Sequence, residues 1–538
     1  MKDKQRNRLV QRMLDPTFYD HPATRIELVE THISWIFLAG EFAYKLKKPV
    51  NFGFLDFSTL EKRRYFCQEE LRINKRFAPQ LYLEVVQIGG KQDEPKLNGK
   101  PVLDYAVKMK RFPQQKQLDR MLAAGQLTNN HIEKFALKIA RIHRDAPIAG
   151  AHSHFGSPQA IIDPILQNFI QIRRFLPDPG MIRQVDRLEE WSRDAYTQLK
   201  PIFLQRKAAG FIRECHGDIH LANMAWFDAA PLLFDGIEFN ENLRWIDPIS
   251  DVAFLVMDLD DRGESGLGWR FLNHYLQESG DYPGMALLNF YKIYRAMVRA
   301  KVTCLRLSQS DLREAERNDD LELLQSYLEL ATSYMTPRAS LLIITHGLSG
   351  SGKSSFVNQL APLCNGICLH SDLERKRLYQ LAPTENSHSQ IAAGIYSTAA
   401  SIKTYSRLHE LADILLKANI LTLVDATFIK HSSREQMRQL ALKRQIPLVI
   451  LDFPLAEKEL RQRIKQRTRQ TGQISEATEE VLDNQLAHEE PLVATERNHV
   501  IGINPKTEVE QIAEQLKKLS SDYPPPLPRP SPLKGEGG

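Results

Sequence analysis

The feature that most constrains this chain is a short glycine-rich pattern, Gly347-Leu-Ser-Gly-Ser-Gly-Lys353-Ser354. It matches G-x-x-x-x-G-K-[ST] and directly follows the apolar run 341–345, Leu-Leu-Ile-Ile-Thr, which predicts a buried strand. Glycines at these positions let backbone N–H groups point inward at a polyphosphate, and the helix that follows adds the positive end of its dipole. The pattern therefore predicts a strand, a phosphate-binding loop and a helix, as in α/β domains built on a parallel sheet.

The residues of this loop have expected roles in binding ATP and Mg²⁺. Lys353 is expected to reach the β and γ phosphates, and the Ser354 hydroxyl is expected to bind Mg²⁺. The other loop residues are expected to surround the phosphates: Gly347, Leu348, Ser349, Gly350, Ser351 and Gly352. A flexible Gly-Ser turn without a ligand is the alternative interpretation.

Two later apolar runs, 421–424 and 447–453, have the composition of strands in a parallel sheet. Asp425 ends the first run, in a position that resembles the Walker B acid and would orient the ligands of Mg²⁺. A plain turn at the strand end is the alternative interpretation of Asp425.

Asp372 follows an apolar run that ends at Leu369, where ligands of open α/β sheets bind. Its carboxylate is expected to accept a proton from a substrate hydroxyl, and Arg375 is expected to hold an anionic group. Asp372 could instead cap the N-terminus of a helix, and the two roles are compatible.

One predicted helical stretch is rich in basic residues: Arg461, Arg463, Lys465, Arg467 and Arg469. Arg463 and Arg467 are four residues apart and therefore share one face of the helix. A cationic helix that closes over the transferring phosphate would need this arrangement. The alternative is a solvated basic face beside Glu457 and Glu459.

Together these features resemble the small P-loop kinases, such as gluconate kinase, chloramphenicol phosphotransferase, zeta toxin and polynucleotide kinase. The resemblance covers about residues 340–520. It implies phosphoryl transfer from ATP to a hydroxyl group, with Asp372 as the base and Arg463 or Arg467 as lid arginines. It does not imply a particular substrate.

A second motif lies far upstream, in His216-Gly-Asp218-Ile-His220-Leu-Ala-Asn223. Its form, H-x-D-x-x-x-x-N, is the spacing at which protein-kinase-like enzymes place a base for the substrate hydroxyl and a ligand for Mg²⁺. Asp235 follows a short apolar strand signal, where the metal-binding acid of a kinase falls. The two histidines also have the H-x-x-x-H spacing of zinc sites, but no third ligand follows in the zinc-peptidase pattern.

The residues before this motif predict a small β-rich lobe. The runs 33–38 and 42–50 read as strands, and alternation places Lys45 and Lys47 on one face of the second strand. Residues 59–78 have helical spacing, with an apolar stripe of Phe66, Ile73 and Phe77. Helices dominate from about residue 115 to 210 and from about 268 to 335.

This arrangement resembles the aminoglycoside phosphotransferase and choline kinase group over roughly residues 25–330. The resemblance implies a bilobal α+β protein-kinase-like domain in which Asp218 is the catalytic base and Asn223 and Asp235 bind metal. It also implies that His216 braces the loop. Asp247 and Asp251 would be structural acids that support it.

The same resemblance implies that a lysine on the second strand holds the α and β phosphates and pairs with a glutamate of the following helix. The candidates are Lys45 or Lys47, with Glu69 or Glu70. We favour Lys45 and Glu70, because Glu70 lies on the apolar stripe that points toward the sheet. No G-x-G-x-x-G loop precedes Lys45, and solvated edge-strand charges are the alternative for these lysines.

Length and composition agree with this division. A chain of 538 residues is too long for one hydrophobic core, and its net charge of +5 is too small to demand a nucleic-acid partner. No apolar run reaches the roughly 18 residues needed to cross a bilayer. Five scattered cysteines without a CxxC pair favour a reduced, cytoplasmic protein.

We therefore expect three segments: a kinase-like domain over 1–336, a P-loop NTPase domain over 337–520, and a disordered Pro/Gly-rich tail over 521–538. Over its whole length the chain resembles a bacterial group in which two such domains are fused. The expected function is ATP- and Mg²⁺-dependent phosphoryl transfer to a small-molecule hydroxyl. The alternatives are a nucleotide-binding regulator or scaffold without turnover, and a polynucleotide kinase-like activity.

Overall fold

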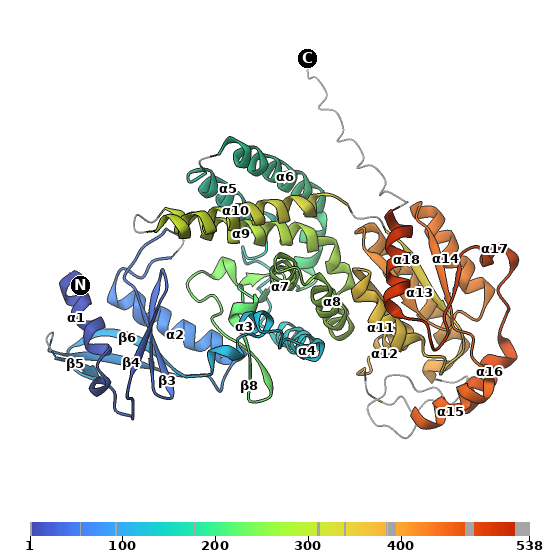
Figure 1. Cartoon of the computed structure of the whole chain (residues 1–538), viewed down its shortest axis with the longest axis horizontal. Helices are drawn as coiled ribbons and strands as arrows, with labels where there is room; N and C mark the ends of the chain where they lie inside the picture. Colours follow the sequence, from blue (N-terminus) through green and yellow to red (C-terminus); the bar gives the residue numbers. More distant parts are fainter. Residues whose placement is uncertain are drawn as a thin grey trace, which may run out of the picture. The chain divides into compact units, whose positions relative to one another are not determined.

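The computed structural model describes residues 3–53, 55–91, 94–176, 178–308, 312–337, 340–383, 385, 394–467 and 478–521. The chain divides into two compact units, which Figure 1 shows in sequence colours. The first unit comprises Met1–Arg262 and Phe290–Ala331, and the second comprises Gly263–Asn289 and Thr332–Gly538. Nearly all of the expected tail, 521–538, lies outside the described residues.

The first unit begins with helix α1 (Asp3–Met13) and a six-stranded antiparallel sheet in the order β1-β2-β3-β6-β4-β5. Its strands are β1 (Ile26–Glu30), β2 (Ser34–Ala39), β3 (Phe42–Lys47), β4 (Tyr82–Lys91), β5 (Glu94–Leu97) and β6 (Val102–Lys110). Helix α2 (Leu60–Phe77) buries Cys67, Ile73 and Phe77. This is the expected β-rich lobe. The predicted strands 33–38 and 42–50 correspond to β2 and β3, and the predicted helical stretch 59–78 corresponds to α2.

Helices make up the second lobe of the first unit. They are α3 (Leu118–Ala123), α4 (Asn129–Asp145), α5 (Pro158–Arg173), α6 (Pro179–Ala208), α7 (Pro248–Asp261), α9 (Leu288–Leu307) and α10 (Glu314–Met335). Two short antiparallel pairs lie among them: β7 (Arg213–Glu214) with β10 (Trp245–Ile246), and β8 (Met224–Phe227) with β9 (Ala230–Leu233). The unit is thus an α+β bilobal kinase-like domain, as expected.

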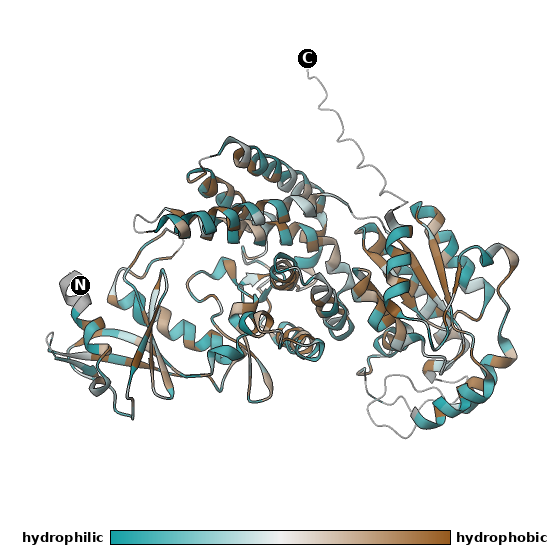
Figure 2. Cartoon of the chain, in the orientation of Figure 1, coloured by the Kyte–Doolittle hydropathy of each residue, from teal (hydrophilic) through white to brown (hydrophobic). Residues whose placement is uncertain are grey.

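The second unit is an α/β domain with a five-stranded parallel sheet in the order β12-β13-β11-β14-β15. The strands are β11 (Leu342–His346), β12 (Gly366–His370), β13 (Leu421–Asp425), β14 (Leu448–Asp452) and β15 (Val500–Gly502). Every residue of β11, β12 and β13 is buried, which explains their continuous apolar runs. Figure 2 shows the apolar sheet between helices whose outer faces are polar.

Helices surround this sheet. They are α8 (Ser265–Ser279), α11 (Lys353–Leu363), α12 (Ser371–Leu378), α13 (Thr398–Lys417), α14 (His431–Arg444), α15 (Glu457–Arg467), α16 (Glu479–His488), α17 (Ala494–Arg497) and α18 (Val509–Ser521). Because all strands are parallel, the carboxyl ends of β11, β12 and β13 lie at one edge of the sheet. The loop 347–352 follows β11 directly at this edge.

Residues 263–289 differ from the expected division at residue 337, because they belong to the second unit. Asn273 of α8 is buried against β12, where its Nδ2 donates to the Gly366 carbonyl at 2.8 Å. The Cys368 N–H donates to Asn273 Oδ1, also at 2.8 Å. Helical periodicity indicates which face of a helix is buried, but not which hydrophobic core that face packs against. The sequence therefore placed this helix in the first domain, whose residues flank it on both sides in the chain.

Among the described residues, no helix combines the length and the apolar composition that a membrane span requires. All five cysteines, each in the described part of the chain, are buried free thiols.

Candidate active site

Two lysines at the end of β3 contact one glutamate of α2. Lys45 Nζ lies 2.9 Å from Glu70 Oε1, and Lys47 Nζ lies 2.6 Å from Glu70 Oε2. All three side chains are buried, so the alternative of solvated edge-strand lysines is wrong. Glu69 instead pairs with Arg72, at 2.9 Å. The structure thus brings both candidate lysines to Glu70 and neither to Glu69.

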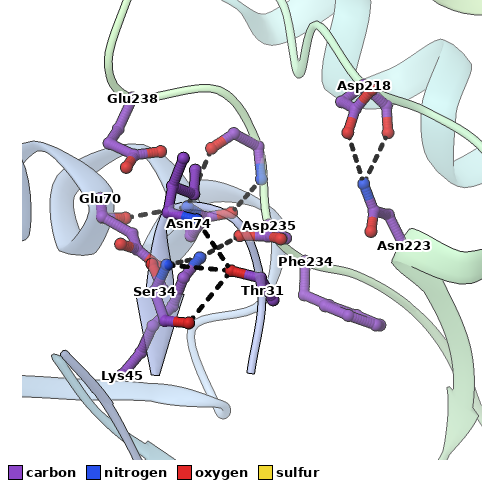
Figure 3. Close-up of polar contacts among 12 residues, drawn as sticks. Thr31, Ser34, Lys45, Glu70, Asn74, Asp218, Asn223, Phe234, Asp235 and Glu238 are labelled. Atoms are coloured by element: carbon purple, nitrogen blue, oxygen red, sulfur yellow. Dashed lines mark hydrogen bonds and ion pairs between the residues drawn. The ribbon is translucent and has the colours of Figure 1, made fainter. Parts of the chain in front are cut away.

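Two more carboxylates complete this cluster, and Figure 3 labels its members Lys45, Glu70, Asp235 and Glu238. Lys45 also pairs with Asp235, and Lys47 pairs with Glu238. Burial alone would raise the pKa of Glu70, but Lys45 and Lys47 lower it to about 2. Burial raises the pKa of Glu238 above its ordinary value. Glu238 has no expected role from sequence, because nothing local indicates that it meets a strand some 190 residues away.

The loop that carries Asp235 is held by polar contacts to the β-rich lobe. Asp235 has a left-handed backbone, with φ 63°, and its N–H donates to Tyr82 Oη at 3.0 Å. The next N–H, of Gly236, donates to Asn74 Oδ1 at 2.8 Å, while Asn74 Nδ2 donates to the Glu70 carbonyl at 3.0 Å. Asn74 was missed from sequence. The sequence feature that could have indicated Asn74 is an amide side chain placed beside the apolar stripe of α2.

Acids of α7 hold the backbone of the loop 216–223. Asp251 accepts the N–H groups of His216 and Gly217, both at 2.9 Å. Asp258, which was missed from sequence, accepts the Leu221 N–H at 2.9 Å. Asp247 pairs with Arg206 Nε at 2.6 Å and caps α7 instead of touching the loop.

His216 joins this loop to the strand that leads to Asp235. Its Nε2 lies 3.0 Å from the Phe234 carbonyl, and its Nδ1 accepts the Asp218 N–H at 3.3 Å. Burial lowers its pKa, so the imidazole is neutral with its proton on Nε2. Both ring nitrogens are therefore engaged with backbone groups, which excludes His216 as a zinc ligand in this arrangement.

Asp218 and Asn223 face each other across the loop. Asn223 Nδ2 donates to Asp218 Oδ2 at 2.9 Å and to its carbonyl at 3.0 Å. His220 Nε2 lies 3.4 Å from Asp218 Oδ2. Burial alone would raise the pKa of Asp218, but His220, His216 and Arg295 hold it well below its usual range. The carboxylate is therefore ionised at neutral pH, and 33% of the side chain is exposed.

Lys45, Asp218 and Asp235 line one cavity of about 960 Å³. The Asp235 side chain is 46% exposed. The Asn223 amide donates through Nδ2, and its Oδ1 accepts no hydrogen bond from the described residues. A carboxylate and an amide oxygen are ligands that Mg²⁺ accepts. In the adjoining cluster, Lys45 and Lys47 face the three carboxylates of Glu70, Glu238 and Asp235. One negative charge is therefore in excess, which also suits a cation.

In the second unit, the loop after β11 has the backbone of a phosphate cradle. Gly347, Gly350 and Gly352 have φ of 138°, 87° and 99°, a region that favours glycine. A Cβ on Gly350 would lie 3.1 Å from Ile464 Cγ1, and one on Gly347 would lie 3.0 Å from the Phe453 carbonyl oxygen. Larger residues at these positions would distort the loop.

Lys353, Ser354 and Asp425 meet at this loop. Lys353 Nζ donates to the carbonyls of Gly347 and Leu348, at 2.8 Å and 2.7 Å. Asp425 accepts from His370 Nδ1 at 2.8 Å. Burial alone would raise the pKa of Asp425, but His370, Ser354 and Lys353 lower it. A buried, ionised carboxylate beside a serine hydroxyl offers donor groups that Mg²⁺ accepts.

Helices α15 and α16 contact the loop from their buried face. Arg463 Nη1 lies 3.4 Å from the Ser351 carbonyl, and Gln485 both accepts the Ser349 N–H at 2.8 Å and donates to its hydroxyl at 2.9 Å. Gln485 was missed from sequence, because nothing local links it to a loop 136 residues earlier. The side chain of Arg467 lies outside the described residues.

Two other basic residues of α15, Arg461 and Lys465, pair with acids. Arg461 contacts Glu457 at 2.7 Å and Asp483 at 2.5 Å, and Lys465 contacts Glu479 at 3.3 Å. The basic stretch is thus divided between a solvated, paired face and the loop-facing Arg463.

Asp372 is the second residue of α12, half-buried at the carboxyl end of β12. His370 occupies the N-cap position, so the alternative of Asp372 as the cap is wrong. Arg375, one turn later, is buried over the Tyr396 ring at 5.1 Å and donates to the Ile395 carbonyl at 2.9 Å. Its Nε has no partner among the described residues.

This chain is similar to several known proteins. The model of a family described as "AAA domain" matches residues 342–492. Uncharacterized protein Rv2004c of Mycobacterium tuberculosis is 30% identical over 430 residues, which cover 79% of this chain and 84% of that protein. A protein of Mycobacterium bovis, Mb2027c, matches to the same extent.

Among solved structures, the amicoumacin kinase hAmiN has a TM-score of 0.39 at 10% identity, covering 61% of this chain and 96% of that one. A gluconokinase from Sinorhizobium meliloti has a TM-score of 0.24 at 17% identity, covering 34% and 94%. The mycobacterial alignments, at 430 residues, are longer than either compact unit and so include parts of both. This chain belongs to the family of those mycobacterial proteins, and residues 342–492 of its second unit match the model of an AAA domain.

Proposed function

We propose that the first unit transfers the γ-phosphoryl group of ATP to a hydroxyl group of a small molecule, with Mg²⁺ bound beside the phosphates. The observation that carries this proposal is the convergence of Lys45, Asp218 and Asp235 on one cavity. In-line phosphoryl transfer is mostly a problem of positioning and charge neutralisation, and these residues supply both.

Lys45 is proposed to hold the α and β phosphates. Burial alone would lower its pKa, but Asp235, Glu70 and Glu238 raise it well above the ordinary value, so its charge is permanent. Asn223 and Asp235 would hold Mg²⁺. Bound there, the ion would neutralise charge that develops on the phosphates.

Asp218 is proposed to accept a hydrogen bond from the acceptor hydroxyl and to take up its proton. The acceptor oxygen bonds to the γ-phosphorus while the bond from that phosphorus to the bridging oxygen breaks and ADP leaves. The proton then passes from Asp218 to water. Because the transition state is loose, a carboxylate of low pKa can serve here.

For the second unit we propose a separate phosphoryl-transfer centre with its own ATP. Lys353 and the loop 347–352 would bind the phosphates, and Ser354 and Asp425 would hold Mg²⁺. Asp372 is proposed as the base, with Arg463 and Arg467 as lid arginines. The contacts of Arg463 with the loop and of Asp425 with Ser354 support this assignment.

We also propose that both reactions take place in the cytoplasm. Five buried free thiols suit a reducing compartment, and ATP is available there.

The test measures phosphoryl transfer from ATP by the full chain to a panel of hydroxyl compounds, with products identified by mass spectrometry. Asp218→Asn is expected to lower the kcat of first-unit products at least about 100-fold, whereas Lys353→Ala leaves those products unaffected. Asp194→Asn, on the exposed face of α6, is the matched control. Full transfer by the Asp218→Asn protein, or nucleotide binding without transfer to any compound, would contradict the proposal.

A further inference from the structure

The cavity around Asp218 extends beyond the proposed catalytic residues, between helices α5 and α9. Its α5 wall carries Gln159, Asp163, Gln167, Asn168, Gln171 and Arg174, and its α9 wall carries Tyr294, Val298, Lys301, Val302 and Leu305. None of these side chains has a task in the phosphoryl-transfer scheme above. Because both walls line the cavity that contains Asp218, they face the space in which the acceptor must lie.

The α5 wall is rich in amides on one helix face. Asp163, Gln167 and Gln171 follow one another at intervals of four residues, which places one carboxylate and two amides in a row along the cavity. Each amide offers both hydrogen-bond donors and an acceptor. A row of such groups can pair with several neighbouring hydroxyls of one ligand, each of which also donates and accepts.

Asn168 provides an independent sign of a missing ligand. It lines the cavity with only 2% of its surface exposed, and its Nδ2 has no hydrogen-bond partner among the described residues. Buried polar atoms are almost always paired in native proteins, because leaving a donor unmet is costly. An acceptor atom from a bound molecule would satisfy this donor.

The charges of this wall favour an anionic group over a polycationic ligand. Outside the proposed catalytic cluster, the walls carry one acid, Asp163, against two bases, Arg174 and Lys301. Lys301 is half-buried. Burial, followed by the charge of Arg295, lowers its pKa to about 8. A ligand with several ammonium groups would need an excess of carboxylates here, whereas an anionic group would meet two cations.

We propose that the acceptor of the first unit is a polyhydroxylated compound that carries an anionic group. Its hydroxyls pair with the α5 amides and with Asn168, and its anionic group lies toward Lys301 and Arg174. The inference rests on the proposed function, since it assumes that the hydroxyl to be phosphorylated lies at Asp218. It narrows the acceptor from any hydroxyl compound to an acidic sugar or an acidic polyol.

The test uses three hexoses that differ in charge but little in shape: D-glucuronate, D-glucose and D-glucosamine. Binding to the full chain is measured by saturation-transfer NMR, which needs no turnover. We expect glucuronate to bind about tenfold more tightly than glucose, and glucosamine to bind most weakly. Tightest binding of glucosamine, equal binding of all three, or no binding of any would overturn the proposal.

Variants identify the groups responsible. Lys301→Met is expected to remove the preference for glucuronate over glucose, and Lys301→Arg is expected to keep it. Because the preference is a ratio measured on one preparation, it does not depend on how much protein is folded. Lys443→Met, at an exposed position of α14, is the matched control. An unchanged preference in Lys301→Met would also overturn the proposal.

The same samples separate this inference from the proposed function. If glucuronate binds as expected but no phosphoryl group is transferred by the wild-type chain, the acceptor class holds and the proposed function fails. If a cationic hydroxyl compound is phosphorylated in an Asp218-dependent manner, the proposed function holds and the acceptor class fails.

Discussion

Asn74 Oδ1 accepts the N–H of Gly236 at 2.8 Å, which ties helix α2 to the loop that carries Asp235. The same helix positions Glu70, and Asn74 Nδ2 donates to the Glu70 carbonyl at 3.0 Å. The partner of Lys45 and the proposed metal ligand are therefore held by one amide. A displacement of α2 would move both of them.

We expect Asn74→Ala to lower kcat/KM for ATP by about 10- to 100-fold, because misplacing phosphate-binding groups by about 1 Å has an effect of this size. The loss of two buried hydrogen bonds should also lower the free energy of unfolding by about 1–3 kcal/mol. Asn130→Ala, at an exposed position of α4, is the control for an asparagine without such contacts. A loss of stability with unchanged kinetics would show that Asn74 only stabilises the fold.

The two lysines of β3 are expected to respond differently to substitution. Lys45 lines the cavity, whereas Lys47 does not and pairs with the buried Glu238. Lys45→Met should lower kcat by about 100- to 1,000-fold, as the loss of an electrostatic contact to the transition state does. Lys47→Met should instead lower the free energy of unfolding by about 3–5 kcal/mol, because it leaves a buried carboxylate uncompensated.

A second change tests the reason for the Lys47 effect. Glu238→Gln removes the uncompensated charge, so the double variant Lys47→Met/Glu238→Gln should recover part of the stability in urea unfolding. Two results would contradict this reason: Lys47→Met that unfolds at the wild-type urea concentration, or a double variant less stable than Lys47→Met alone. Either would show that the pairing of Lys47 with Glu238 does not stabilise the fold.

Most of the site residues that could be predicted from the sequence lie in short motifs or follow from strand alternation. The glycine-rich loop and the loop 216–223 each lie within eight consecutive residues, so their chemistry is visible in the sequence. Strand alternation placed Lys45 and Lys47 on one face, and both reach Glu70. For the same reason it could not say which of them also faces the cavity.

The rest depends on contacts between distant residues. Glu238, Gln485 and Asp258 act through partners that lie from 37 to 191 residues away, and no spacing rule links such pairs. Helix α8 shows the same limit at the level of the fold. Its pattern predicts a helix with a buried face, but only the contact of Asn273 with β12 assigns that face to the second unit.

Stability is expected to depend on pH through Glu70. Its pKa is lowered from 4.5 to about 2, because Lys45 and Lys47 outweigh the effect of burial. A lowered pKa means that the ionised group stabilises the folded state above about pH 4.5, and that this contribution is lost as the pH falls toward 2. The difference in the free energy of unfolding between wild type and Glu70→Gln, measured by urea unfolding, should therefore become smaller as the pH falls from about 4.5 toward 2. If this difference stays constant from pH 7 to pH 3, ionised Glu70 is not the source of the pH dependence.

The acceptor preference is expected to depend on pH through Lys301. Its pKa of about 8 means that the ammonium charge is present at pH 7 and is lost as the pH rises through 8. The preference for glucuronate over glucose should then decline between pH 7 and pH 9 in the wild-type chain. Lys301→Arg should hold the preference across this range, since a guanidinium stays charged. A wild-type preference that does not change with pH would rule out Lys301 as the group that titrates.

The full chain is expected to bind two molecules of a non-hydrolysable ATP analogue, because each unit has its own phosphate-binding lysine. Isothermal titration in the presence of Mg²⁺ should give two sites for the wild type. Lys353→Ala removes the loop's cation and should leave one site, and Lys45→Met should leave the other, while the double variant binds none. Lys443→Ala, an exposed lysine of α14, should retain both sites. A single site in the wild type, or two sites in Lys353→Ala, would mean that the glycine loop does not bind a nucleotide of its own.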